Sequence, residues 1–430
     1  MSNFRNQFPE KFVFGVATAA YQIEGNQNGR SGMSIWDKFA SEGGVVNNEN
    51  GSVACDHYNR FEADLDLIKL GGFDAYRFSF SWARIQPEGT WNNEIGLDFY
   101  DRLIDAQLER GLRPFGTAYH WDLPLALGAK GGWTSRDTAL RFGDYCGMLA
   151  RKFGDRMESM ATINEPWCVA WLSHFLGHHA PGQRDISAAA KAMHHILLAH
   201  GKGVEAARAE SDLDMGIVLN FEPGYPASDK RADEEACERH NSTYNKWFID
   251  AITAKTYPDA TLSALENHMP ENWQDDMDII SQKLDFIGIN YYTRKIIAAD
   301  NTPWPSLKEV DGGLPKTDMG WEIEPQGLAD VIDFVAERTG DMPIYITENG
   351  MAAASGIKDA DRIDYFEKHL EVCTKKAETV PLKGYFAWSL LDNFEWAFGY
   401  DKRFGIVHVD YKTQKRTPKD SYKWWQHNLG

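Results

Sequence analysis

The sequence predicts an α/β fold, a closed (β/α)8 TIM barrel with long loops, as one domain over residues 1–430. Two observations predict this fold. Short apolar runs alternate with helical stretches along the whole chain. The runs are hydrophobic almost without interruption, as expected for parallel strands whose two faces are both buried. No linker, repeat or low-complexity segment divides the chain, so we expect a single domain.

The predicted strands are short apolar runs bounded by turn and helix signals. They cover residues 12–17, 75–80, 114–119, 160–163, 215–219, 286–289, 344–347 and 384–387. Eight strands that alternate with helices in one chain indicate closure into a barrel rather than an open sheet. Pro166 ends the fourth run, so we expect Glu165 at the last position of that strand.

The predicted helices follow from apolar periodicity and end signals. They cover residues 59–70, 96–110, 134–154, 186–200, 233–256, 325–338, 359–377 and 419–427. Gly71 stops the first, Thr134 and Asp137 form an expected capping box, and Pro325 occupies a tolerated first-turn position. Long connections follow the first strand (a Gly/Asn-rich segment to about residue 53), the sixth (to about residue 321) and the eighth.

Composition narrows the possible partners. The chain has 45 basic and 63 acidic residues, a net charge of −18, which argues against nucleic acid or an anionic membrane as partner. No apolar run is long enough to span a membrane, and residues 1–11 lack the apolar segment of a secretory signal. The five cysteines are scattered, so we expect reduced thiols in a cytoplasmic protein. Aromatic residues make up 13%, which fits either a packed core or a cleft for sugars.

Nearly every predicted strand is followed by a residue that can hydrogen-bond or stack. In chain order these are Gln22, Trp82, His120 with Trp121, Asn164 with Glu165, Asn220, Asn290 with Tyr292, Glu348, and Trp388. All C-terminal strand ends of a parallel barrel open on one face, so these residues predict a lined pocket on that face.

Two carboxylates, Glu165 and Glu348, are the reactive groups of this predicted pocket. No serine or cysteine stands beside a base, and the histidines lack metal-binding spacing, so we expect neither metal nor cofactor. Adjacent pairs such as His194-His195 point in different directions and are expected to be structural. Two carboxylates among amides and indoles suit glycoside hydrolysis, in which one is ionised and the other carries a proton.

Arg77 lies inside the second predicted strand, where a charge is tolerated only when it is paired. It forms either a structural ion pair with any acid or a functional one that keeps Glu348 ionised, with help from the Tyr292 hydroxyl and from Asn290. In the functional interpretation, the charge on Glu348 raises the pKa of Glu165, which then serves as the acid.

Four motifs resemble those of glycoside hydrolase family 1 β-glucosidases. They are residues 14–19 (FGVATA) leading to 22–25 (QIEG), 162–166 (TINEP), 346–350 (ITENG) and 388–396 (WSLLDNFEW). The resemblance covers essentially the whole chain. It implies a retaining mechanism with Glu165 as acid/base and Glu348 as nucleophile. It also implies a sugar pocket, made of Gln22, His120, Asn164, Asn290, Tyr292, Trp388, Glu395 and Trp396.

Several residues bear on specificity. The resemblance implies that Glu395 accepts hydrogen bonds from the O4 and O6 hydroxyls of an unphosphorylated sugar and repels a 6-phosphate. Trp321 and Trp167 are either contacts to the leaving group or packing residues, and Asn220 completes the predicted substrate contacts. Cys168, beside the acid, is expected to be an inert buried thiol, because no cationic partner is visible in the sequence.

The leading hypothesis is therefore an exo-β-glucosidase for cellobiose, cello-oligosaccharides and aryl or alkyl glucosides, with a small-molecule β-glycoside as partner. A β-galactosidase, a β-fucosidase or a transglycosylase would share the same machinery. From another class, a sugar-binding barrel without turnover would be favoured by the loss of either glutamate, and both are present. A second copy of the chain, in a homo-oligomer, is among the partners considered.

Overall fold

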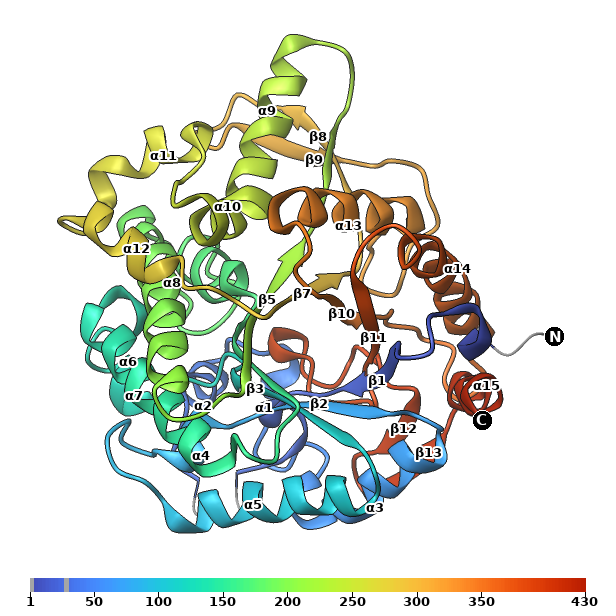
Figure 1. Cartoon of the computed structure of the whole chain (residues 1–430). Coiled ribbons are helices and arrows are strands. Elements are labelled where there is room, and N and C mark those ends of the chain that lie inside the picture. The colour runs from blue at the N-terminus through green and yellow to red at the C-terminus, as the bar shows by residue number, and fades with distance from the viewer. Residues whose placement is uncertain (1–3, 27–30) are drawn as a thin grey trace.

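The computed structural model describes residues 4–26 and 31–430 and contains a closed barrel of eight parallel strands (Figure 1). The strands are β1 (Val13–Ala17), β2 (Ala75–Ser79), β3 (Arg113–Tyr119), β4 (Ser159–Asn164), β5 (Asp214–Phe221), β7 (Phe286–Tyr291), β10 (Ile344–Asn349) and β11 (Leu382–Trp388). Their order around the barrel is β1-β11-β10-β7-β5-β4-β3-β2. The predicted fold class and all eight predicted strands are confirmed.

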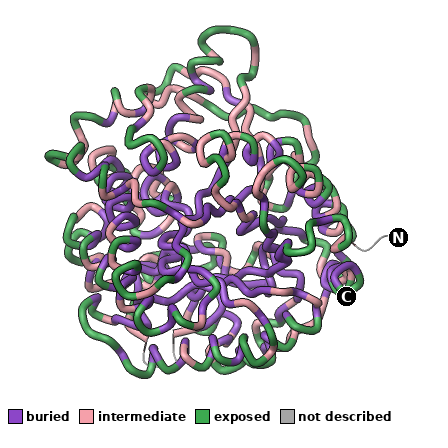
Figure 2. The backbone as a smooth tube through the Cα atoms, viewed as in Figure 1, coloured by how far each residue is buried: buried purple, intermediate pink, exposed green. Residues whose placement is uncertain are grey.

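Helices surround the barrel (Figure 1). The longer ones are α3 (His57–Leu70), α5 (Glu94–Glu109), α7 (Arg136–Phe153), α8 (Ile186–Arg208), α9 (Arg231–Asn241), α10 (Trp247–Ala254), α13 (Pro325–Thr339), α14 (Ala360–Lys376) and α15 (Asp420–Leu429). Shorter ones are α1 (Ala20–Ile23), α2 (Ile35–Ser41), α4 (Trp82–Ile85), α6 (Leu125–Gly128), α11 (Asp259–Leu265) and α12 (Met277–Ile280). Figure 2 shows buried backbone concentrated in the barrel and exposed backbone at the periphery.

Three helix predictions need correction. The expected capping box at Thr134 is wrong: α7 begins at Arg136, and the Thr134 hydroxyl donates to the Gly131 carbonyl at 2.7 Å instead. The predicted helix 186–200 continues to Arg208, because further small and apolar residues extend its buried face. The predicted helix 233–256 is two helices, α9 and α10, joined by a π-helical turn, Ser242–Lys246, that shifts the register of the second.

The long connections carry small elements without a periodic signature in the sequence. After β5 and β7 the chain forms a three-stranded sheet, β6 (Gly224–Pro226), β8 (Lys295–Ala299) and β9 (Leu307–Val310). After β11 it forms a hairpin, β12 (Val407–Asp410) and β13 (Lys415–Pro418). Residues 1–3 and 27–30, from the polar N-terminal segment and the Gly/Asn-rich connection, lie outside the described residues. No described helix combines the length and apolarity needed to cross a membrane.

Strand register brings the polar strand ends to one rim. Asn290 on β7 pairs with Asn220 on β5 and with Glu348 on β10. The pairing shifts register just before Glu348 and just before Asn164, and such irregularities re-aim side chains near active sites. Gly350 permits a close approach behind this rim, since a Cβ there would lie 1.9 Å from the Trp388 carbonyl oxygen.

Candidate active site

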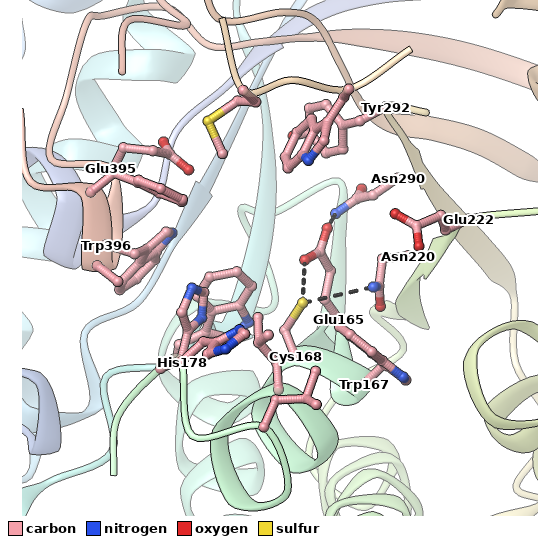
Figure 3. A pocket seen from close by; sticks show the side chains of 18 of the residues that line it. Glu165, Trp167, Cys168, His178, Asn220, Glu222, Asn290, Tyr292, Glu395 and Trp396 are labelled. Atoms are coloured by element: carbon pink, nitrogen blue, oxygen red, sulfur yellow. Dashed lines mark hydrogen bonds between the residues drawn. The ribbon is translucent and has the colours of Figure 1, made fainter. Parts of the chain in front are cut away.

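A cavity of about 960 Å³ opens at the C-terminal ends of the barrel strands (Figure 3). Most of the predicted site residues line it, namely His120, Trp121, Glu165, Trp167, Asn220, Asn290, Tyr292, Trp321, Glu348, Trp388, Glu395 and Trp396. Gln22, Arg77 and Asn164 do not line it, but they bond to residues that do. Trp82 does neither: it is fully buried in the core and stacks on Tyr145 at 5.0 Å between ring centroids.

Glu348 is held by a cation and a hydroxyl. Arg77 Nη1 lies 2.6 Å from one carboxylate oxygen, and the Tyr292 hydroxyl donates to the other at 2.7 Å. Burial raises the pKa of Glu348, while Arg77 and Tyr292 act in the opposite direction. Because the guanidinium stays charged at any ordinary pH, it favours the ionised carboxylate beside it.

Among the described residues, no cation forms a hydrogen bond with Glu165. Asn290 Nδ2 donates to its Oε1 at 2.7 Å, and the Cys168 thiol donates to its Oε2 at 3.2 Å. Burial and the negative charge of Glu348 raise its pKa to about 8. The structure corrects its expected position: β4 ends at Asn164, and Glu165 follows with a φ of 50°, a strained conformation of the kind found at functional sites.

Asn164 connects the two carboxylates from beneath the cavity. Its Oδ1 accepts from Arg77 Nη2 at 2.7 Å and from Asn290 Nδ2 at 3.1 Å, which turns its Nδ2 toward His120 Nε2 at 3.1 Å. Burial and Arg77 lower the pKa of His120, so the ring is neutral. With Nε2 as acceptor, the ring proton is on Nδ1, which has no hydrogen-bond partner in the part of the chain that the structure describes.

A third carboxyl, Glu395, lies on the side of the cavity that Trp396 also occupies (Figure 3). Gln22 Nε2 donates to its Oε2 at 3.3 Å. Burial, together with the charges of Glu348 and Glu165, raises its pKa to about 8. Trp388 and Trp396 flank the His120 ring, each stacked at 5.9 Å between centroids.

The family model of glycosyl hydrolase family 1 matches residues 4–429. The chain belongs to glycosyl hydrolase family 1. A beta-glucosidase of Agrobacterium sp. is 48% identical over 97% of this chain and 94% of its own. Beta-glucosidase A of Thermotoga maritima is 48% identical over 97% of both chains. A solved family 1 β-glucosidase structure from Thermotoga maritima has a TM-score of 0.96 and 47% identity over 98% of this chain and 99% of its own.

The cavity of this family 1 chain is lined by more residues than the sequence predicted. Its further lining residues include Phe39, Val45, Val46, Leu172, Leu176, His178, Glu222, Tyr244, Lys295, Glu309, Met319 and Phe398. Most lie on the connections and the β6-β8-β9 sheet, whose positions depend on tertiary packing. Only Glu222 carried a local signal, because it follows the strand-end residue Asn220 by two positions. Within the part of the chain that the structure describes, no group of three or more His, Cys, Asp or Glu side chains is arranged to hold a metal ion.

Proposed function

We propose that this protein is a retaining exo-β-glucosidase. It removes the terminal, non-reducing β-D-glucosyl residue from cellobiose, cello-oligosaccharides and aryl or alkyl β-glucosides. One observation carries the proposal: a single cavity holds two carboxyls in different states, Glu348 paired with the Arg77 cation and Glu165 bonded to an amide and a thiol, with a raised pKa. Family 1 membership and relatives that are named beta-glucosidase support it.

In the first step, the Glu348 carboxylate attacks the anomeric carbon while the bond to the leaving oxygen breaks. Glu165 gives its proton to that oxygen, and the sugar becomes an ester of Glu348. In the second step, Glu165 takes a proton from water, and the water oxygen attacks the anomeric carbon and releases Glu348. Two inversions restore the β configuration, and the mechanism predicts carboxyl groups about 5–5.5 Å apart.

The glucosyl unit is bound on the side of Glu395. Trp388 and Trp396 offer apolar faces to the sugar ring, and His120 Nδ1–H, which has no partner among the described residues, is a donor for a hydroxyl. Gln22 lies behind the cavity lining and supports the sugar site through its bond to Glu395. Asn164 supports this layer from beneath. Burial, followed by the charges of Glu348 and Glu165, raises the pKa of Glu395. The negative charge of the ionised Glu348 disfavours a 6-phosphate on the bound sugar.

We propose that the protein works in the cytoplasm and contributes to cellulose degradation. All five cysteines lie within the described residues and are free and buried, which suits a reducing compartment.

Two tryptophans border the space for the leaving group. They are Trp321, in ring contact with Tyr292 at 5.5 Å between centroids, and Trp167.

Replacement of each glutamate by glycine tests the mechanism. Glu348→Gly is expected to lose hydrolysis of an aryl β-glucoside by at least about 10⁴-fold and to regain turnover with azide, which yields the α-glucosyl azide. Glu165→Gly is the matched control, because azide then attacks the glucosyl-enzyme from the opposite face and yields the β-azide. Product anomers are read by NMR. A β-azide from Glu348→Gly, or undiminished hydrolysis, would contradict the assignment.

A further inference from the structure

Glu222 is a carboxyl that the proposed mechanism does not use. It follows β5 by one residue and lines the cavity. In Figure 3, Glu222 and Asn220 lie on one side of Glu165, and Glu395 and Trp396 lie on the other. If the glucosyl unit binds beside Glu395, Glu222 faces the leaving group.

The backbone of Glu222 is fixed, whereas its carboxylate is not bonded. Its N–H donates to Asn245 Oδ1 at 2.8 Å, and its carbonyl accepts from Asn245 Nδ2 and His240 Nε2, both at 2.9 Å. The side chain is only 15% exposed, yet no hydrogen bond reaches its carboxylate among the described residues, and its closest cation, Lys295 Nζ, is 3.9 Å away. A nearly buried carboxyl that accepts no hydrogen bond is costly even with a cation 3.9 Å away, and a ligand that donates to it removes that cost.

The neighbours of Glu222 define what such a ligand offers. Lys295 Nζ lies 2.6 Å from Glu309 Oε2, so Glu222, Lys295 and Glu309 form an acceptor–donor–acceptor row along one wall of the cavity. Two carboxylates disfavour an anionic leaving group, and Lys295 disfavours a cationic one. An apolar group would bury the carboxylate of Glu222 and leave it unpaired. Sugar hydroxyls both donate and accept, and they match this row.

We propose that Glu222 is a specificity-determining residue that selects a sugar, rather than an apolar group, as the leaving group. The inference rests on the proposed β-glucosidase function and extends it to the leaving-group side. Its hydrogen bonds form with hydroxyls of the departing glucose or of the unit beyond it. Glu222 therefore favours cellobiose and cellotriose over aryl and alkyl glucosides.

Kinetics of Glu222→Leu and Glu222→Gln test this role. We measure kcat/KM for cellobiose, cellotriose, 4-nitrophenyl β-glucoside and octyl β-glucoside, with Glu238→Leu on the outer surface of α9 as the control. For Glu222→Leu we expect a loss of at least about 10-fold on the better of the two cello-oligosaccharides, because an unpaired substrate hydroxyl replaces a bonded one. For the two apolar glucosides, kcat/KM falls by less than about twofold or rises. Glu238→Leu leaves kcat/KM for all four substrates unchanged.

The outcomes distinguish a failure of the proposed role of Glu222 from a failure of the proposed β-glucosidase function. If the wild type hydrolyses none of the four β-glucosides, the proposed function fails. If it hydrolyses them and Glu222→Leu lowers all four equally, or spares both cello-oligosaccharides, only the role of Glu222 is overturned. If Glu222→Leu does not fold, Glu222→Gln decides. A loss of about threefold or more confined to the cello-oligosaccharides supports the role, and unchanged ratios overturn it.

Discussion

Glu165 and Glu348 are the same type of side chain, and their contacts hold them in different states. Glu348 is bonded to a guanidinium and a phenol, so its ionised form is stabilised. Glu165 is bonded to an amide and a thiol and lies near the charge of Glu348, so its protonated form is favoured. The proposed assignment of Glu165 as acid and Glu348 as nucleophile rests on the contact of Arg77 with Glu348.

The pH dependence of kcat/KM tests this difference. The active form has Glu165 protonated and Glu348 ionised, so activity falls as pH rises through the pKa of Glu165, about 8. It also falls as pH decreases through the pKa of Glu348, which is raised above its ordinary value. We expect a bell-shaped profile for cellobiose. The pH profile for a dinitrophenyl glucoside, whose leaving group needs no proton, should lack most of this basic limb. An identical basic limb for both substrates would exclude Glu165 as the acid.

At the scale of elements, neighbouring strands fix the orientation of the Asn290 amide. Thr347 on β10 donates its hydroxyl proton to Asn290 Oδ1 on β7 at 2.7 Å. Asn290 Nδ2 is therefore directed to Glu165 on one side and to Asn164 on the other. The Thr347 hydroxyl thus links β10, through Asn290 on β7, to Glu165, the proposed acid.

Removal of that hydroxyl tests the coupling between strands. Thr347→Val keeps the shape of the side chain but leaves Asn290 Oδ1 unsatisfied, so the amide loses its preferred orientation. We expect kcat/KM for cellobiose to fall about 10-fold, in line with a lost buried hydrogen bond of 1–3 kcal/mol, and the basic limb to move. Thr347→Ser keeps the donor and should restore both. If Val and Ser variants behave alike, the hydroxyl has no positioning role.

Sequence patterns were sufficient for elements with a strong period and insufficient for the segments between them. The eight barrel strands are continuous apolar runs, so their existence followed from the chain. The π-helical turn Ser242–Lys246 leaves no gap in apolar periodicity, and the prediction merged α9 with α10. Glu165 and Glu348 were found because strand ends converge on one face. Lys295 on β8 and Glu309 on β9 were missed because the β6-β8-β9 sheet brings them to the cavity through tertiary contacts, and Glu222 was missed although it follows Asn220 by two positions.

For the whole molecule, the carboxyls that the proposed activity needs lower the stability of the folded protein. Glu165 and Glu348 are buried, Glu395 is half-buried in the same cavity, and desolvation raises the pKa of each of the three carboxyls. A raised pKa in the folded state means that the unfolded chain releases the proton more readily. Each such group therefore destabilises the folded protein as pH rises above its unfolded pKa.

Glu165→Gln measures this trade-off. The unfolded pKa of a glutamate is about 4.3, and that of folded Glu165 is about 8, so the destabilisation is absent below about pH 4, grows between these values and is complete above pH 8. Glutamine retains the size and has no proton to lose. We expect the variant to unfold at a temperature higher by roughly 2–4 °C at pH 8, on the order of a few kcal/mol, and to match the wild type at pH 4. Glu337→Gln on the exposed surface of α13 should change little at either pH. A gain that is equal at both pH values would show that packing, and not the proton on Glu165, is responsible.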